Sequence, residues 1–225
     1  MKRLAGGLVF GTAALSAVLF VGCANTPPTP DWQLNAKSTL ERSVQAYLQG
    51  NSRVAAAEFA ASRTALARTG RADLLARAEL TRCAANVASL VFEPCIGYAP
   101  LAADAGEPQR AYNDYLQGAL QPADVALLPE QHRALAAAKP SLESLRSMSD
   151  PLGQLVAAAV LLQTGRAEPG VIDIAVTTSS AQGWSRPLLA WLNAQLMRVQ
   201  AAGEVGQAEQ LQRRIARVLE TAPAR

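Results

Sequence analysis

The chain has 225 residues, half of them hydrophobic and 17% charged, with 21 Lys and Arg against 18 Asp and Glu. This length suffices for one sizeable domain or one array of repeats. The basic residues do not cluster with aromatic side chains, so the sequence gives no electrostatic support to nucleic-acid binding.

The N-terminus has the plan of a secretory signal. Lys2 and Arg3 form a positive head, and an apolar run over residues 4–21 leads to Cys23. A run of this length would also suit a membrane-spanning helix. It contains several glycines, begins directly after the basic pair and has no charged stop after it. We therefore predict a cleaved signal peptide over residues 1–22.

The pentapeptide LFVGC, which ends at Cys23, resembles the lipobox of bacterial lipoproteins, with Phe20 where Leu is usual. The resemblance implies cleavage before Cys23 and acylation of its thiol and amine, which anchors the protein to a membrane. Ala24 stands where inner-membrane lipoproteins commonly carry Asp, so the resemblance implies the outer membrane, facing the periplasm. The proline-rich residues 23–31 would form a lipidated, extended tether. An ordinary signal peptide with an incidental cysteine is the alternative.

Residues 32–222 are predicted to form a single all-helical domain of about ten helices. They are rich in Ala, Leu, Gln, Glu and Arg, which favour helices, and the alternation typical of strands is nearly absent. Breaks at Gly and Pro predict helices over 32–49, 53–69, 72–92, 96–104, 108–117, 151–164, 169–181, 186–202 and 204–221, with irregular structure over 119–148. The second segment carries one face at helical spacing, made of Ala55, Phe59, Ser62 and Leu66.

Internal similarity suggests a repeat. The tetrapeptide YLQG occurs twice, at an interval of about two 34-residue units. Hairpins over 36–69 and 186–221 place a small residue, Ala55 or Ala208, early in the second helix, and 152–181 forms a looser hairpin. These positions resemble the tetratricopeptide repeat, which implies antiparallel helical hairpins stacked as an α-solenoid. The Trp-Leu-Gly signature is missing and the middle third keeps no register, so a compact helical array is the alternative.

The tetratricopeptide resemblance also implies where a partner would bind, because the first helix of each hairpin lines a concave surface in such arrays. It suggests four polar residues for contact with a protein or peptide partner: Arg42, Gln45, Gln195 and Arg198. A solvated helix face is the alternative for all four. Trp184, at a turn between predicted helices, either locks a hairpin in the core or belongs to the rim of a groove.

No catalytic residue, cofactor or metal site is predicted. His132 is the only histidine, and it stands beside Arg133 at a helix start that we expect to be exposed. Recognisable zinc spacings, a GxSxG elbow and a phosphate-binding P-loop are absent from the sequence. A glycoside hydrolase uses two carboxylates that converge in the fold, and this alternative stays open, although no motif points to it.

The leading hypothesis is a periplasmic lipoprotein of the outer membrane that serves as a scaffold for a protein or peptide in envelope assembly, secretion or cell-wall upkeep. The alternatives are a lipid-anchored hydrolase that acts on envelope polymers and a structural helical lipoprotein without a dedicated partner. The membrane is contacted through the N-terminal lipid, and neither a metal nor a nucleic acid is expected as a ligand.

Cys83 and Cys95 form an even pair once Cys23 is acylated, and the periplasm is oxidising, so we predict a disulfide between them. A redox pair would more typically be CxxC, and free buried thiols are the other alternative. Twelve residues of one helix span about 18 Å, whereas a disulfide needs Cα atoms roughly 4.4–6.8 Å apart. The helix must therefore end between the cysteines, and we expect the break at residues 92–94 because Pro94 disfavours a helical residue before it.

Overall fold

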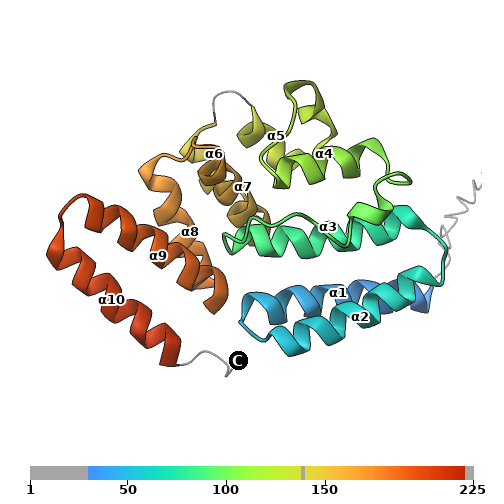
Figure 1. The fold of residues 1–225 in the computed structure, drawn as a ribbon, viewed down its shortest axis with the longest axis horizontal. Helices are drawn as coiled ribbons and strands as arrows, with labels where there is room; N and C mark the ends of the chain where they lie inside the picture. Colours follow the sequence, from blue (N-terminus) through green and yellow to red (C-terminus); the bar gives the residue numbers. More distant parts are fainter. Residues whose placement is uncertain (1–29, 138–139, 221–225) are drawn as a thin grey trace, which may run out of the picture.

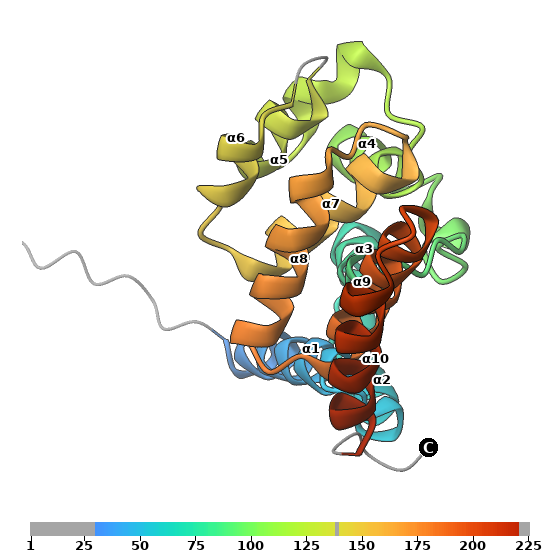
Figure 2. The same ribbon diagram turned by 90° about the vertical axis from the view of Figure 1, so that its left-hand side faces the viewer.

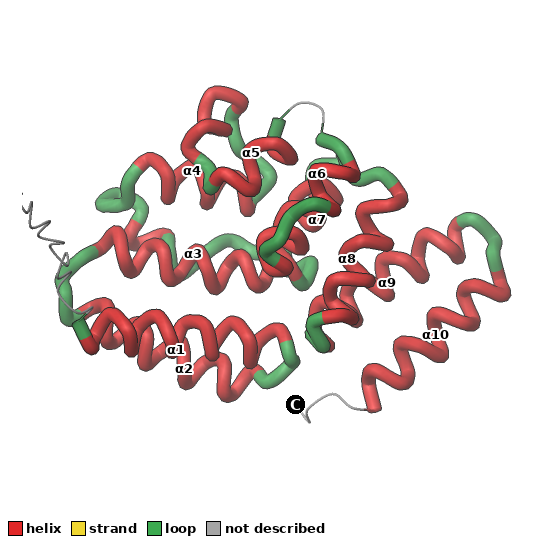
Figure 3. The backbone as a smooth tube through the Cα atoms, turned by 180° about the vertical axis from the view of Figure 1, so that it is seen from behind, coloured by secondary structure: helices red, strands yellow, loops and turns green. Residues whose placement is uncertain are grey.

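The computed structural model describes residues 30–137 and 140–220, and this part of the chain is built from helices (Figure 1). The all-α fold with about ten helices is confirmed, and Figure 3 shows helices joined by loops. The α-helices in the described ranges are α1 (Asp31–Leu48), α2 (Ser52–Ala67), α3 (Ala72–Ala88), α4 (Glu107–Leu116), α5 (Glu130–Ala136), α6 (Leu142–Arg146), α7 (Pro151–Gln163), α8 (Pro169–Ala181), α9 (Ser185–Ala201) and α10 (Val205–Glu220); the 3₁₀-helices are η1 (Ala99–Leu101) and η2 (Pro122–Leu127).

The N-terminal predictions fall outside the described residues. The signal peptide, Cys23 and the tether up to residue 29 belong to that part of the chain. Among the helices that are described, none combines the length and the apolar character needed to cross a membrane.

The helix boundaries follow local chemistry closely where the sequence carries a cap. The Asp150 carboxylate accepts hydrogen bonds from the backbone N–H groups of Leu152 and Gly153, at 3.2 and 3.0 Å, and Pro151 is the first helical residue. Gly50 ends α1 with a φ of 90°, a backbone conformation that a side chain would strain. The predicted breaks at both places are therefore confirmed.

Three predicted boundaries are wrong. The third helix ends at Ala88 and not near residue 92, because Leu90 turns the chain with a φ of 58°. That turn is closed by the N–H of Val91, which donates to the carbonyl of Asn86 at 3.0 Å. The helix predicted over 96–104 is only the three-residue η1, and the irregular region over 119–148 contains η2, α5 and α6.

The first hairpin packs closely through small residues. All four side chains of the predicted face of α2 are buried, namely Ala55, Phe59, Ser62 and Leu66. Ser43 of α1 donates a hydrogen bond to the carbonyl of Ala55 at 2.8 Å, and Ser62 of α2 donates to the carbonyl of Ala36 at 2.9 Å. A larger residue at position 55 would hold the two backbones apart, so the small residue has the packing role that the sequence pattern implies.

Helix α7 forms the centre of the molecule. Its residues 153–161 are all buried, so it has no solvent-facing side over this stretch. It contacts α3, α4, α5, α6 and α8, and Figures 1 and 2 show these helices around it. Helix α1 also contacts α9. In a solenoid each repeat touches only its neighbours along the chain, so these contacts between distant segments fit the compact array; the tetratricopeptide likeness stays a prediction.

Cys83 and Cys95 lie at disulfide distance, with their Cα atoms 5.9 Å apart and both side chains buried. The chain reverses after α3 and brings Cys95 back beside that helix. Just beyond it, the backbone of Gly97 approaches the buried carboxylate of Glu79, which Arg63 and Arg82 hold from two sides. A Cβ at position 97 would collide with that carboxylate, so the fold-back requires glycine there.

Candidate functional site

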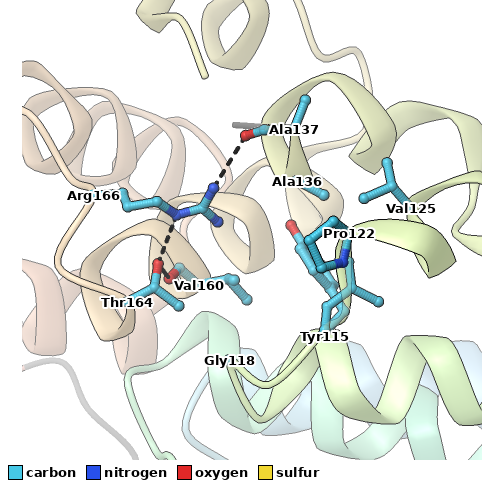
Figure 4. Close-up of a pocket in the computed structure, with 10 residues that line it drawn as sticks. Tyr115, Gly118, Pro122, Val125, Ala136, Ala137, Val160, Thr164 and Arg166 are labelled. Atoms are coloured by element: carbon cyan, nitrogen blue, oxygen red, sulfur yellow. Dashed lines mark hydrogen bonds between the residues drawn. The ribbon is translucent and has the colours of Figure 1, made fainter. Parts of the chain in front are cut away.

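The most developed candidate site is an apolar cavity of about 530 Å³ between the ends of α4, α5 and α7 and the 3₁₀-helix η2 (Figure 4). We call it the α4–α7 cavity. Its volume lies within the range of about 300–1,000 Å³ that is usual for small-molecule sites. Its lining consists of Tyr115, Gly118, Leu120, Pro122, Val125, Ala136, Ala137, Val160, Thr164 and Arg166.

Turns at the ends of two helices shape this cavity. Helix α4 ends at Leu116, and Gly118, with a φ of 69°, lets the chain turn toward η2. A Cβ on Gly118 would lie only 3.1 Å from Cγ2 of Thr164, so the close approach of the two turns also favours glycine. Helix α7 ends at Gln163, and Gly165 turns the chain with a φ of 67°. The next residue, Arg166, extends its side chain along the cavity.

Among the described residues of the lining, Arg166 is the one that is charged at neutral pH. Its Nε donates to Oγ1 of Thr164 at 3.1 Å, and its Nη1 donates to the carbonyl of Ala137 at 3.1 Å. These contacts fix the half-buried guanidinium, yet a guanidinium has more N–H donors than they use. Within the described ranges, no carboxylate lies within ion-pair distance of Arg166.

Three rings form a wall beside the cavity. Tyr115 and His132 are both buried, with ring centroids 5.1 Å apart, and the Tyr115 hydroxyl lies 3.4 Å from Nδ1 of His132. Tyr112 packs on both of them, at 6.1 and 5.8 Å. Tyr115 lines the α4–α7 cavity, whereas Tyr112 and His132 line a second cavity of about 410 Å³. The wall therefore separates the two cavities.

The expectation that His132 is exposed is wrong, because its side chain is only 1% exposed. The error follows from treating residues 119–148 as irregular. Leu128, His132 and Leu135 stand at helical spacing and all three are buried, so α5 and the two residues before it carry an inward face. That spacing is the signal that would have placed the histidine inside.

Burial keeps the ring wall uncharged at neutral pH. It lowers the pKa of His132 to about 4, and the Asp150 carboxylate opposes that shift. Burial raises the pKa of Tyr112 and that of Tyr115, in the latter case against the opposing effect of the Arg166 charge. The wall can therefore pack and form hydrogen bonds, and among the described lining residues Arg166 supplies the charge of the α4–α7 cavity.

Three of the five predicted partner-binding residues lie where helices meet, namely Arg42, Gln45 and Trp184. The indole Nε1 of Trp184 donates to Oε1 of Gln45 at 2.7 Å, and the Trp184 side chain is buried. This pair joins α9 to α1, which agrees with the hairpin-locking alternative for Trp184. Arg42 forms an ion pair with Glu58 at 2.9 Å, between α1 and α2.

The other two predicted partner-binding residues, both on α9, gather around one acid of α8. Nε2 of Gln195 donates to Oδ1 of Asp173 at 2.9 Å, and Arg198 donates to the carbonyl of Pro169 at 2.8 Å and lies 3.5 Å from the same Oδ1. The structure thus brings Gln45 to Trp184 and Gln195 to Arg198. A role of these residues in partner binding stays a prediction.

Fold and site together define an all-helical protein with an apolar cavity that holds one guanidinium. In the part of the chain that the structure describes, no group of three or more His, Cys, Asp or Glu residues is placed to hold a metal ion. Comparisons of the chain with protein-family models, with curated proteins and with solved structures find no match. The function must therefore be inferred from this chain's own residues.

Proposed function

We propose that the protein is a lipoprotein of the outer membrane that faces the periplasm and serves as a binding scaffold for another protein or a peptide in envelope assembly, secretion or cell-wall upkeep. One observation carries the proposal. A lipobox-like LFVGC ends at Cys23 and is followed by the proline-rich PPTP stretch, and the helical body begins directly after it, at Asp31. The lipid would fix the location and the tether would give the body reach.

The cysteine pair supports the proposed location in the periplasm. Cys83 and Cys95 are buried and lie at disulfide distance, and disulfides persist in oxidising compartments such as the periplasm. With Cys23 acylated, every cysteine of the chain would have a defined chemical state.

The state of the single histidine supports binding over catalysis. A general base works best when its pKa lies near the operating pH. Burial among tyrosines lowers the pKa of His132 to about 4, far below neutral pH. The hydroxyl next to His132 belongs to Tyr115, and burial raises the pKa of that group, which makes it a poor nucleophile.

The anchor is tested by replacing its cysteine. In cells, the wild-type protein should sediment with outer membranes and incorporate labelled palmitate, whereas Cys23→Ser should be unlabelled and leave the membrane fraction. Ala24→Asp keeps the cysteine and serves as the matched control, with continued labelling but a shift toward the inner membrane. A Cys23→Ser protein that stays in the membrane through an intact N-terminal segment contradicts the lipoprotein proposal.

The scaffold role is tested by crosslinking in intact cells, followed by identification of the captured proteins by mass spectrometry. Wild-type protein should capture the same partner repeatedly. The Cys23→Ser form, released from the membrane, should capture less of it because the two would no longer be held on one surface. Repeated recovery of no specific partner contradicts the scaffold role and favours a purely structural lipoprotein.

A further inference from the structure

The geometry points to the α4–α7 cavity as a binding site for a small organic acid, with one carboxylate carried on a compact apolar body. This inference goes beyond the proposed scaffold role and does not depend on it. It rests on three features of the cavity as the described residues form it: a fixed cation that no described acid pairs with, an apolar lining, and few polar groups to satisfy a more polar ligand.

The cation selects the charge of the ligand. Arg166 is half-buried, and its contacts with Thr164 and Ala137 hold the guanidinium in place before any ligand arrives. Charge-assisted hydrogen bonds from a guanidinium to a carboxylate are among the stronger polar contacts in proteins, and Arg can donate two in parallel. Because no carboxylate of the described residues pairs with Arg166, an anionic ligand would supply one.

The lining selects the rest of the ligand. Leu120, Pro122, Val125, Ala136 and Val160 contribute apolar side chains, and the α4–α7 cavity is large enough for a small molecule. Removing apolar ligand surface from water stabilises the complex roughly in proportion to the area that is buried. A short alkyl or aromatic body therefore suits the lining.

The scarcity of polar lining groups favours a small acid over a peptide. Each peptide unit brings a donor and an acceptor that need partners when buried. The Tyr115 hydroxyl already lies beside His132, and the Thr164 hydroxyl already donates to the carbonyl of Val160 at 2.7 Å. A peptide end would leave its amide groups without partners, whereas an acid on an apolar body brings only its carboxylate.

The test uses the purified full chain in detergent at pH 7.5, titrated calorimetrically against a detergent blank. The probes are hexanoate, its neutral counterpart hexanamide, and N-acetyl-trialanine with a free carboxylate. We expect hexanoate to bind at least tenfold more tightly than either of the other two. Equal affinity for hexanoate and hexanamide, or no hexanoate binding, overturns the inference. Tighter binding of the tripeptide overturns it in favour of a peptide terminus.

Two variants locate the binding. Arg166→Gln should weaken hexanoate binding at least tenfold and leave hexanamide unchanged, since only the charge-assisted contact is lost. Arg213→Gln, which changes an exposed residue of α10, is the matched control and should bind like wild type. Ala136→Leu fills the cavity and should weaken hexanoate binding while leaving Arg166 in place, which keeps the test decisive if Arg166→Gln fails to fold. Unchanged hexanoate affinity in Ala136→Leu, or in a folded Arg166→Gln, overturns the assignment.

Discussion

Folding places the ring of His132 against Tyr115 and Tyr112, where water hardly reaches it. Burial lowers the pKa of His132 from its ordinary value near 6.5 to about 4. Between these values the unfolded chain binds a proton that the folded chain does not, so the folded state loses stability as the pH falls. The pKa difference corresponds to a loss of about 3 kcal/mol between pH 6.5 and pH 4. Urea unfolding over this pH range should show the decline.

The control is His132→Phe, which keeps an aromatic ring beside the tyrosines and removes the titrating group. Its overall stability will differ, because the Tyr115 hydroxyl loses its neighbour, but its unfolding free energy should depend less steeply on pH between 6.5 and 4. Carboxylates contribute the same slope to both proteins. Equal slopes for wild type and variant contradict the buried neutral state of His132.

Single-sequence reasoning reaches some of the residues discussed above and misses others. Cys83 and Cys95, which lie outside the cavity, are predicted as a pair because acylation of Cys23 leaves an even count in an oxidising compartment. Arg166 carries no such signal, since its neighbours in the cavity come from η2 and from the ends of α4 and α5, far away in the chain. The burial of His132 is indicated by its helical spacing to Leu128 and Leu135. That spacing is easily missed because the surrounding sequence, residues 119–148, suggests irregular structure.

At the scale of elements, α9 is attached to α1 by side chains at its N-terminus. Trp184 bonds to Gln45, and the Arg186 guanidinium donates to the carbonyl of Tyr47 at 2.7 Å and stacks 4.3 Å from the centre of its ring. Trp184→Phe should cost about 1–3 kcal/mol of stability, because it removes the N–H and also part of the buried ring. Trp184→Ala should cost about 3–5 kcal/mol, because it also leaves a cavity. Urea unfolding measures both.

A double-mutant cycle separates the hydrogen bond from ring packing. If the bond joins α9 to α1, then Trp184→Phe should cost less in a Gln45→Ala background, where its acceptor is already gone and only the packing of the ring is lost. If the losses of unfolding free energy caused by Trp184→Phe and Gln45→Ala are strictly additive, the hydrogen bond contributes nothing to the attachment of α9 to α1.

Element boundaries are predictable where a local group defines them. Asp150-Pro151 marks the start of α7, and Gly50 marks the end of α1, because caps and left-handed turns act within a few residues. The end of α3 is not predictable in this way. Leu90 adopts the left-handed conformation that glycine normally supplies, and the tertiary packing of the fold-back outweighs that local preference.

Which helices contact one another in the folded protein is the feature that is hardest to predict from the sequence. The stretch 153–161 of α7 is buried on every side, so no amphipathic period shows which neighbours it has. Contacts between α3 and α7, and between α1 and α9, join segments far apart in the chain. A single sequence predicts that the molecule is helical and where most helices lie; which helices meet depends on complementary surfaces that form only in the folded state.

For the whole molecule, the cysteine pair ties α3 to the segment that leads on to α4. A disulfide between residues 12 apart restricts the unfolded chain by about 3 kcal/mol in the chain-entropy model. For a protein of this size, reduction should then lower the melting temperature by roughly 6–12 °C. The double variant Cys83→Ser, Cys95→Ser is the control and should melt at one temperature with and without reductant. Wild-type protein from the periplasm that melts equally in both conditions, or that shows two free thiols by mass spectrometry, contradicts the disulfide.

Such a result would also remove the support that the cysteine pair gives to an oxidising compartment. The proposed anchor at Cys23 would still be decided by palmitate labelling.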